Sequence, residues 1–395
     1  MKPVLNIKSV VQRSVCGLAS LAACSAAVAA APYAITDLGT LGGTISRAYA
    51  LNDGGQVVGE SGTAGGHDRA FLWEAGVMTH LGIMPGDSHS RGVDINDAGH
   101  AAVLSEYQDP YTGWEMGHAL LWADGEIWLY GSWESNLVIR GLTDDDVAFG
   151  TGSEGYWGPM QGFRSAIYEF LWFVPEGLQG DSSVITAMNG AGLSVGWACY
   201  GENEVAFTLI GSDYEYLASL GGDRARALDV NDNDEIIGIA QGSEGGDHAV
   251  LWTRSEPIDL GTFAPAAINN ATQVVGALGS SAVLWEGGEL IDLNESIPAE
   301  CGWHLLHASD INDAGQIVGW GVNPDGETHG FLLTVLHAAD LNADGFIDGL
   351  DLLMLLDSWG DCPDPPQACP GDIDDSSAVD VVDLFALLAA WGPYR

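Results

Sequence analysis

Basic residues are scarce in this chain of 395 residues: 12 lysines and arginines oppose 55 aspartates and glutamates, which gives a net charge of −43. Both lysines, Lys2 and Lys8, lie near the N-terminus. So acidic a surface repels the phosphates of nucleic acids and anionic membranes, and we therefore expect no nucleic-acid partner. Saline or calcium-rich surroundings would suit the chain, because ions there screen its self-repulsion.

Long apolar runs are absent after the first 31 residues. Before that point, basic residues up to Arg13 precede an apolar stretch from about Val15 to Ala31, which ends in small residues. This pattern predicts a signal peptide over residues 1–31 and a secreted, extracellular protein with no transmembrane span. One alternative stays open: the sequence LAAC ending at Cys24 resembles a lipoprotein cleavage box, which would leave the protein anchored by a lipid.

Cysteine is scarce as well, with six in the chain and four after the signal peptide. In an oxidising compartment Cys362 and Cys369 could close the short loop between them. Cys199 and Cys301 could be free or paired. None of the four stands at a zinc-site spacing with histidine, so zinc is not expected. The chain also lacks a GxSxG turn, an HExxH motif and a phosphate loop.

The body of the chain is built from a repeat. An asparagine, a turn and a short aliphatic run recur at intervals of 38 to 47 residues. Seven copies begin at Asn52, Asn96, Thr143, Asn189, Asn231, Asn269 and Asn312. An AFLW-like segment follows each copy, and an xDLG-like segment follows most of those. Each copy therefore offers about four short strands separated by turn residues, which is the size of a propeller blade.

The two ends of the repeat predict how the fold closes. The seventh copy stops at Leu336 without an xDLG segment, whereas Tyr33–Gly39 is an xDLG segment with no copy before it. A ring of sheets needs its last blade completed by the other end of the chain, while an open solenoid would need capping segments. We predict a mostly β, seven-bladed β-propeller-like body over residues 33–336, in which the N-terminal strand closes the last blade.

These motifs resemble the HAF family of extracellular repeats. The segments ITDLGTLGG, NDGGQVVG and AFLW carry the resemblance, which covers about residues 33–336. It implies an extracellular location and no established activity.

The tail carries oxygen ligands at the spacing of EF-hand calcium loops. In the first loop they are Asp340, Asn342, Asp344, the carbonyl of Phe346, Asp348 and Asp351. In the second they are Asp372, Asp374, Ser376, the carbonyl of Ala378, Asp380 and Asp383. We expect the second site to be the weaker, because Ser376 is a poorer ligand than aspartate and Ser377 replaces the turn glycine. An amphipathic helix ending in Trp-Gly follows each loop, so the tail predicts Ca²⁺ as a cofactor.

Two calcium loops that are each followed by one helix, with aspartate at the last loop position, resemble a type I dockerin over residues 338–392. Cys362, Cys369 and the twin Trp-Gly endings resemble the GC-type dockerins in particular. The resemblance implies calcium-dependent docking onto a cohesin-like or other docking module. Loop positions 10 and 11 usually set the partner in that family, and here Gly349-Leu350 and Val381-Val382 replace the hydroxyl pair of many dockerins.

Histidines and aromatic residues supply further candidates. His118, His248 and His329 each precede an AFLW-like segment, with His67 nearby, and they could line a ligand- or metal-binding channel or merely hydrogen-bond a neighbouring blade. Recurring tryptophans could pack blades together or bind sugars: Trp73, Trp122, Trp172, Trp252 and Trp285. An aromatic insertion from Tyr107 to Trp172 could form a carbohydrate-binding rim or loosely ordered loops; it holds Tyr111, Trp114, Trp128, Trp133, Tyr156 and Trp157.

Two functions fit these patterns. The first is a secreted, non-catalytic binding or scaffold protein that the calcium-dependent tail tethers to a cell-surface or extracellular complex. The second is a polysaccharide hydrolase carried by the same tail, since dockerins commonly carry such enzymes. Repeat-periodic residues account for nearly all polar positions and leave no unique acid–base cluster, which favours the first function. Carbohydrate is a candidate ligand of the body in either case.

Overall fold

Strands account for most of the residues that the structure describes. The computed structural model describes residues 33–108, 115–130, 136–153, 160–165, 172–253, 256–342, 346–362, 369, 371–374 and 376–393. Within these ranges helices are short: α1 (Glu176–Gln179), the 3-10 turns η2 (Leu293–Glu295) and η3 (Ala299–Cys301), and two helices in the tail. The predicted mostly β fold class is confirmed. The predicted signal peptide and Cys24 lie outside the described residues.

The strands of the body pair antiparallel in groups of four, in chain order. The first three groups are β2–β5 (Gly42–Leu51, Val57–Thr63, Asp68–Glu74, Val77–Gly82), β6–β9 (His89–Ile95, Ala101–Gln108, Glu115–Ala123, Glu126–Leu129) and β10–β13 (Asn136–Leu142, Ala148–Ser153, Gln161–Ser165, Trp172–Phe173). The next three are β14–β17 (Ser182–Met188, Ser194–Tyr200, Asn203–Ile210, Asp213–Tyr216), β18–β21 (Gly221–Val230, Ile236–Gly242, Asp247–Trp252, Pro257–Gly261) and β22–β25 (Ala264–Ile268, Val274–Leu278, Ser281–Glu286, Glu289–Asp292).

The last group draws its strands from both ends of the body. Strands β26 (His304–Ile311), β27 (Ile317–Val322) and β28 (Thr328–Val335) pair in order. Strand β1 (Tyr33–Asp37) then pairs antiparallel with β28, from Tyr33 opposite Val335 to Asp37 opposite Phe331. The first and last strands of the body are therefore neighbours.

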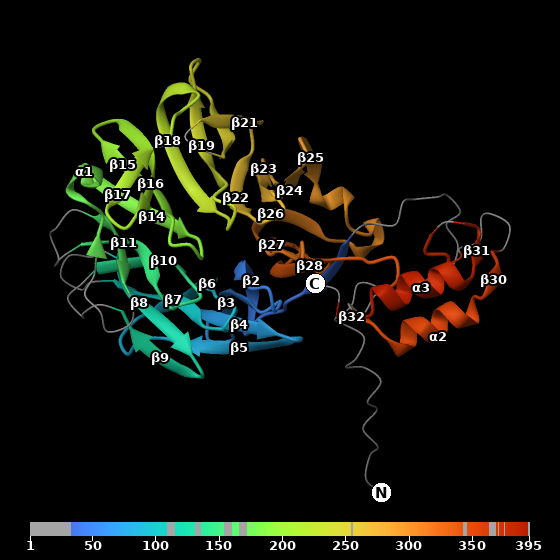
Figure 1. Cartoon of the computed structure of the whole chain (residues 1–395). Helices are drawn as coiled ribbons and strands as arrows, with labels where there is room; N and C mark the ends of the chain where they lie inside the picture. The colour runs from blue at the N-terminus through green and yellow to red at the C-terminus, as the bar shows by residue number, and fades with distance from the viewer. Residues whose placement is uncertain are drawn as a thin grey trace, which may run out of the picture.

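The groups follow one another around a common centre, as the colours in Figure 1 show. The first strand of each group contacts the first strand of the next, and β26 contacts β2. Apolar clusters fill the space between adjacent groups; one of them joins Val57 and Phe71 to Val318 and Leu332. Radial sheets whose first strands surround an axis make the body β-propeller-like.

The repeat motif has a local structural reason. The Asn52 side chain accepts the backbone N–H of Gln56 at 3.0 Å and so closes the turn between the first two strands. A Cβ added to Gly59 would lie 2.0 Å from the carbonyl oxygen of Arg47 on the facing strand. Only glycine permits this close approach, so the glycine that ends the motif is a packing requirement.

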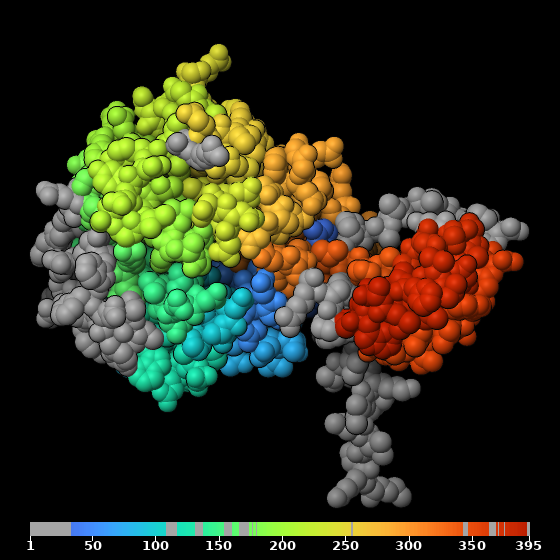
Figure 2. All heavy atoms as spheres, in the orientation of Figure 1, coloured from blue at the N-terminus to red at the C-terminus, as the bar shows by residue number. Residues whose placement is uncertain are grey.

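The tail folds as two interlocked halves. Helix α2 (Gly349–Asp357) and helix α3 (Val381–Ala389) accompany two short ladders, β29–β32 (Phe346–Ile347 and Gly392–Pro393) and β30–β31 (Gly360–Asp361 and Ala378–Val379). Each ladder ties one loop to the end of the other loop's helix, and the glycines of the Trp-Gly endings adopt φ values of 120° and 126° there. Figure 2 shows the tail, in red, as a lobe beside the body.

None of the helices in the described ranges has the length and apolar character that a membrane span requires.

Candidate functional site

The second predicted calcium loop brings three carboxylates together. One oxygen from each of Asp372, Asp374 and Asp383 lies within 4.8 Å of the others. Asp383 is completely buried and accepts the backbone N–H groups of Ile373 at 2.7 Å and of Asp380 at 2.8 Å, which fix its orientation. Oxygen ligands converging from the start and the end of a short loop suit Ca²⁺.

The other predicted ligands of this loop contact one another or the backbone. The Ser376 hydroxyl donates to the carbonyl of Ala378 at 3.0 Å, and Asp380 accepts the N–H of Val382 at 2.7 Å as the N-cap of α3. Ser377 adopts a φ of 71°, the left-handed conformation for which an EF-hand loop uses glycine at this position.

The first loop repeats this framework. Asp351 is completely buried and accepts the N–H groups of Leu341 at 2.8 Å and of Asp348 at 2.8 Å, as Asp383 does in the second loop. Asp340 is buried, and Asn342 donates its backbone N–H to Asp351 at 3.3 Å. Asp344 and the side chain of Phe346 lie outside the described residues.

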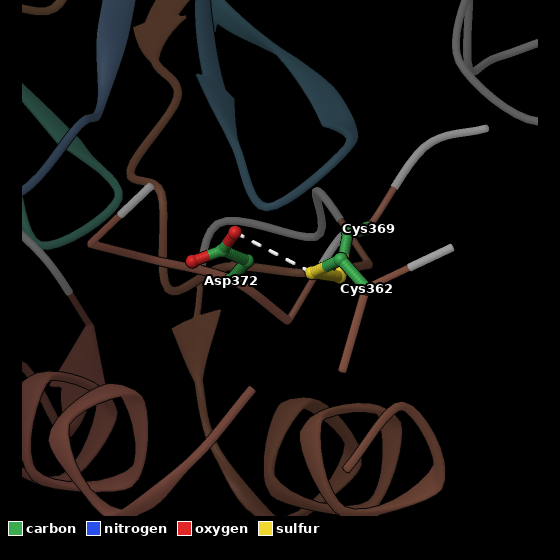
Figure 3. A group of neighbouring side chains, drawn as sticks. All are labelled: Cys362, Cys369 and Asp372. Atoms are coloured by element: carbon green, nitrogen blue, oxygen red, sulfur yellow. Dashed lines mark hydrogen bonds between the residues drawn. A yellow bond between two sulfur atoms is a disulfide. The ribbon is translucent and has the colours of Figure 1, made fainter. Parts of the chain in front are cut away.

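A disulfide joins Cys362 and Cys369 beside the second loop. Figure 3 shows the Cys362 sulfur next to the Asp372 carboxylate, at 3.4 Å from Oδ2. A disulfide sulfur carries no hydrogen, so this is a contact and the two cysteines are not thiolate ligands for a metal. Cys199 and Cys301 carry free thiols.

Both helices expose apolar side chains at matching positions. The exposed fractions lie between 46 and 64 % for residues that recur 32 positions apart: Leu350, Leu353, Leu356 and Trp359 on or after α2, and Val382, Phe385, Leu388 and Trp391 on or after α3. We call these eight residues the apolar face. An exposed apolar patch is a candidate site of interaction with another molecule.

In the body, the repeat turns gather around one end of the axis. They line a cavity of about 240 Å³. The amide of Asn52 donates to the carbonyl of Asn96 at 2.9 Å, and the same bond recurs from copy to copy until Asn312 donates to Asn52 at 3.2 Å. Among the described residues this chain of bonds, which we call the turn ring, is interrupted after the third copy, where Thr143 replaces asparagine.

Three carboxyls lie above the turn ring on the first strands. Asp94, Asp229 and Asp310 each accept a backbone N–H from the next group, for example Asp310 from Leu51 at 2.9 Å. Burial raises the pKa of Asp94 to about 7, of Asp229 to about 6 and of Asp310 to about 8, and mutual repulsion adds to the shift for Asp94 and Asp310. These carboxyls bridge neighbouring groups, and burial makes each of them harder to ionise than an exposed carboxyl.

A row of partly exposed side chains continues along the first strands. It lies three and five residues before the repeat asparagine and includes Arg47, Tyr49, Arg91, Arg140, Arg226 and His307. The intervening residues Ala48 and Ile139 are buried. We call these side chains the inner row.

The inner row was missed from the sequence because it varies between copies. Its arginines at the fifth position before the asparagine pair with glutamates: Arg47 with Glu60 at 2.8 Å and Arg91 with Glu106 at 3.5 Å. A signal was present in the sequence: the inner row lies at fixed offsets from the repeat asparagine. At these offsets some copies have charged or aromatic residues, whereas others have small or aliphatic residues such as valine and alanine.

The predicted histidine candidates do not gather. His118 contacts Asp87 at 2.9 Å, His248 contacts Asp259 at 3.0 Å and His329 contacts Asp37 at 2.8 Å, all through Nδ1. The three histidines lie on third strands of different groups, away from the strands that surround the axis, and each is held by its own aspartate. Among the described residues no histidine, His67 included, belongs to a metal-like cluster.

Several of the recurring tryptophans pack inside the body. Trp73 and Trp252 are buried, and the Trp252 indole donates to the carbonyl of Ala218 at 2.9 Å. Trp122 and Trp285 pack against neighbouring clusters, and the side chain of Trp172 is not described. In the aromatic insertion, Tyr107 stacks on His118 with ring centroids 5.3 Å apart, and Trp128 is 37 % exposed. Five predicted rim residues lie outside the described ranges: Tyr111, Trp114, Trp133, Tyr156 and Trp157.

A cavity of about 660 Å³ opens between the groups β2–β5 and β6–β9. Its lining is polar and includes Glu60, Asp68, Arg91, Glu106 and Tyr107. Arg91 of the inner row lines this cavity, and so does Glu60, the ion-pair partner of Arg47.

No protein-family model and no curated protein matches the chain. Solved structures resemble it at low identity. The structure described as "YCF48 bound to D1 peptide" is 11 % identical, with 78 % of this chain and 96 % of that chain covered and a TM-score of 0.47. Virginiamycin B lyase from Staphylococcus aureus is 11 % identical, with 77 % and 100 % covered and a TM-score of 0.44. TolB from Acinetobacter baumannii is 10 % identical, and this chain spans 74 % of its own length and 65 % of TolB at a TM-score of 0.42. The architecture of this chain rests on its own strand pairings.

Proposed function

We propose that this protein is an exported, non-catalytic binding or scaffold protein, whose propeller body is tethered by a calcium-dependent, dockerin-like tail to a cohesin-like module of an extracellular or cell-surface complex. The observation that carries the proposal is the convergence of Asp372, Asp374 and Asp383 in a loop that ends on the helix bearing half of the apolar face. The HAF-like repeat and the export signal support an extracellular setting.

For the body, the proposal is a seven-bladed propeller closed by its N-terminal strand. The pairing of β1 with β28 supports closure, and so does the bond from Asn312 to Asn52, which joins the last repeat copy to the first. Closure joins the first and last groups of strands, which favours a stable platform for a bound ligand.

Calcium and docking are linked through the helix ends. Three carboxylates held within 4.8 Å repel one another unless a cation neutralises them. Asp383 is also the third residue of α3, and its Oδ2 accepts the N–H of the N-cap Asp380 at 2.8 Å. A bound cation therefore fixes the start of the helix that presents Val382 and Phe385.

Calorimetry on the full chain tests the calcium sites. We expect two calcium ions to bind, and the double change Asp372→Ala with Asp374→Ala to remove one of them. Asp357→Asn, an exposed acid of α2, is the matched control and should leave both. Unchanged stoichiometry in the double variant would refute the loop assignment.

Surface-binding measurements against a panel of cohesin modules test the tether. Leu353→Asp with Phe385→Asp should abolish binding while calcium stoichiometry stays at two, whereas Leu290→Asp, an exposed leucine of the body, should have no effect. Binding that survives a calcium chelator, or no binding to any cohesin, contradicts the tether. Reducing-sugar release from polysaccharides by the purified protein would instead favour the hydrolase.

A further inference from the structure

The cavity between the groups β2–β5 and β6–β9 has the size of a small-ligand site. Its volume of about 660 Å³ falls within the roughly 300–1,000 Å³ that such sites occupy. Part of its lining comes from the ends of β6 and β7 that lie farthest from the repeat turn at Asn96, where His89 pairs with Glu106. Glu60 and Asp68 contribute to the lining from the first group. Sites for apolar ligands are lined mainly by apolar side chains, so this polar lining indicates a polar ligand.

Two ion pairs supply fixed polar groups to the cavity. Arg91 contacts Glu106 on the neighbouring strand at 3.5 Å, and Glu60 accepts from Arg47 at 2.8 Å. The four side chains remain between 18 and 39 % exposed. Each pair cancels its own charge, yet it keeps carboxylate lone pairs and guanidinium N–H groups that can bind a ligand. A hydroxyl group, which both donates and accepts, matches such a pair better than an ion does.

Tyr107 supplies an aromatic wall to the same cavity. Its ring stacks on that of His118, with centroids 5.3 Å apart and planes 18° apart. His118 is buried and contacts Asp87 at 2.9 Å, and Asp87 also accepts the hydroxyl of Ser105 at 2.5 Å. The ring is therefore fixed before a ligand binds, which lowers the entropy cost of binding. An aromatic wall packs against the C–H groups of a sugar ring, while the sugar hydroxyls contact the polar lining.

The geometry points to a binding site for a neutral oligosaccharide in this cavity, with sugar hydroxyls on the two ion pairs and one sugar face against Tyr107. This inference rests on the proposed binding function and names its ligand. It does not depend on the tail, because every residue that lines the cavity belongs to the first two groups of strands and the loop between them.

The charges of the lining disfavour other ligand classes. An anion would meet Asp68 and a protein with a net charge of −43. A cation gains little, because Glu60 and Glu106 are already paired and Asp68 is exposed, where water screens an ion pair. Among the described residues, no three carboxylates of this cavity lie close enough together to share a metal ion. A neutral ligand rich in hydroxyl groups fits the remaining donors and acceptors.

A glycan array and titration calorimetry on the full chain with calcium test the site. The neutral probes are oligosaccharides of glucose, xylose, mannose, galactose and N-acetylglucosamine; the charged probes are those of glucosamine, which are cationic, and of galacturonate, which are anionic. We expect at least one neutral series to bind, and no charged probe to bind more tightly. Glu106→Ala and Tyr107→Ala should each weaken that binding about tenfold or more, since each removes a contact with the sugar.

Two variants outside the cavity are the matched controls. Glu204→Ala removes the same kind of ion pair, with Arg226, and Tyr214→Ala removes a tyrosine that contacts another ring, that of Tyr216. Both should bind the oligosaccharide as the original protein does. If Glu106→Ala or Tyr107→Ala does not fold, Glu106→Gln or Tyr107→Leu replaces it, because these changes preserve more of the side-chain volume and should still weaken binding.

The outcomes separate this inference from the tether. The Asp372→Ala, Asp374→Ala variant should keep full oligosaccharide binding even where docking is lost, and loss of sugar binding in that variant would contradict a site in the body. No binding of any neutral probe, unchanged binding in the cavity variants, an equal loss in the controls, or tighter binding of a charged probe would each overturn the proposal.

Discussion

The body and the tail of this protein achieve order by different means. The body buries apolar side chains between successive strand groups and links its repeat turns by amide hydrogen bonds that are interrupted at Thr143. The tail has a small core around Ile347, Leu355, Val379 and Leu387, and its second loop brings three carboxylates together. A large apolar core is stable without an ion, whereas a bound cation would stabilise a small module by offsetting the repulsion between converging acids.

Removal of calcium should produce the largest difference between the tail and the body in protection from hydrogen exchange. With chelator, we expect the amides of α2 and α3 to lose their protection from hydrogen exchange, because the acids of each loop then repel one another. The amides of the body strands should keep theirs. Mass spectrometry of exchanged peptides gives both results in one experiment, and loss of protection in the body as well would show that the regions are not independent.

The turn ring offers a test within the body. Asn312→Ala removes the bond to the carbonyl of Asn52 and two bonds to Gln316, and it should lower the free energy of unfolding by about 2–3 kcal/mol. Thr143→Asn should complete the ring and raise it by about 0.5–1 kcal/mol, a gain of one buried bond. Urea unfolding at fixed calcium measures both, with Asp145→Ala, an exposed turn residue, as the control. A Thr143→Asn variant that is less stable than the original protein would contradict a stabilising role for the turn ring.

The smallest expected effect concerns pH. The raised pKa values of Asp94, Asp229 and Asp310 mean that the folded body holds more protons than the unfolded chain from about pH 4 up to about pH 8. These groups therefore make the free energy of unfolding fall as pH rises through that window. Unfolding of Asp310→Asn should show a shallower fall between pH 5 and 8, and Asp145→Asn should keep the original slope; identical slopes would exclude Asp310 as a source.

The features that all repeat copies share could be predicted from the sequence. The repeat asparagine and glycine predicted the strand pairs, because every copy needs the same turn and the same close approach. The spacing of acids in the tail predicted which side chains would share a loop, and Asp372, Asp374 and Asp383 do converge. The pairing of Cys362 with Cys369 also agrees with the sequence.

Features that differ between the repeat copies could not be predicted from the sequence. Arg140 stands in the copy whose motif is most degraded, at the bulge between Ile139 and Gly141, where the first copy has Tyr49. The histidines were conspicuous in the sequence, yet each pairs with an aspartate such as Asp259 that lies far from the axis strands. A periodic sequence pattern predicts the strands and turns that every copy shares. A residue such as Arg140, which occurs at its position in one copy alone, stands out only when the copies are compared.

The position of β28 has a mechanical consequence. The strand ends at Val335 and leads directly into the tail, while β27 and β1 pair with it on either side. Tension applied at an anchored tail would run along β28 and be shared by two antiparallel ladders, one of them made by β1, the first strand of the body. The pairing of β1 with β28, which joins the two ends of the body, is thus also the point where a tethered protein would bear load.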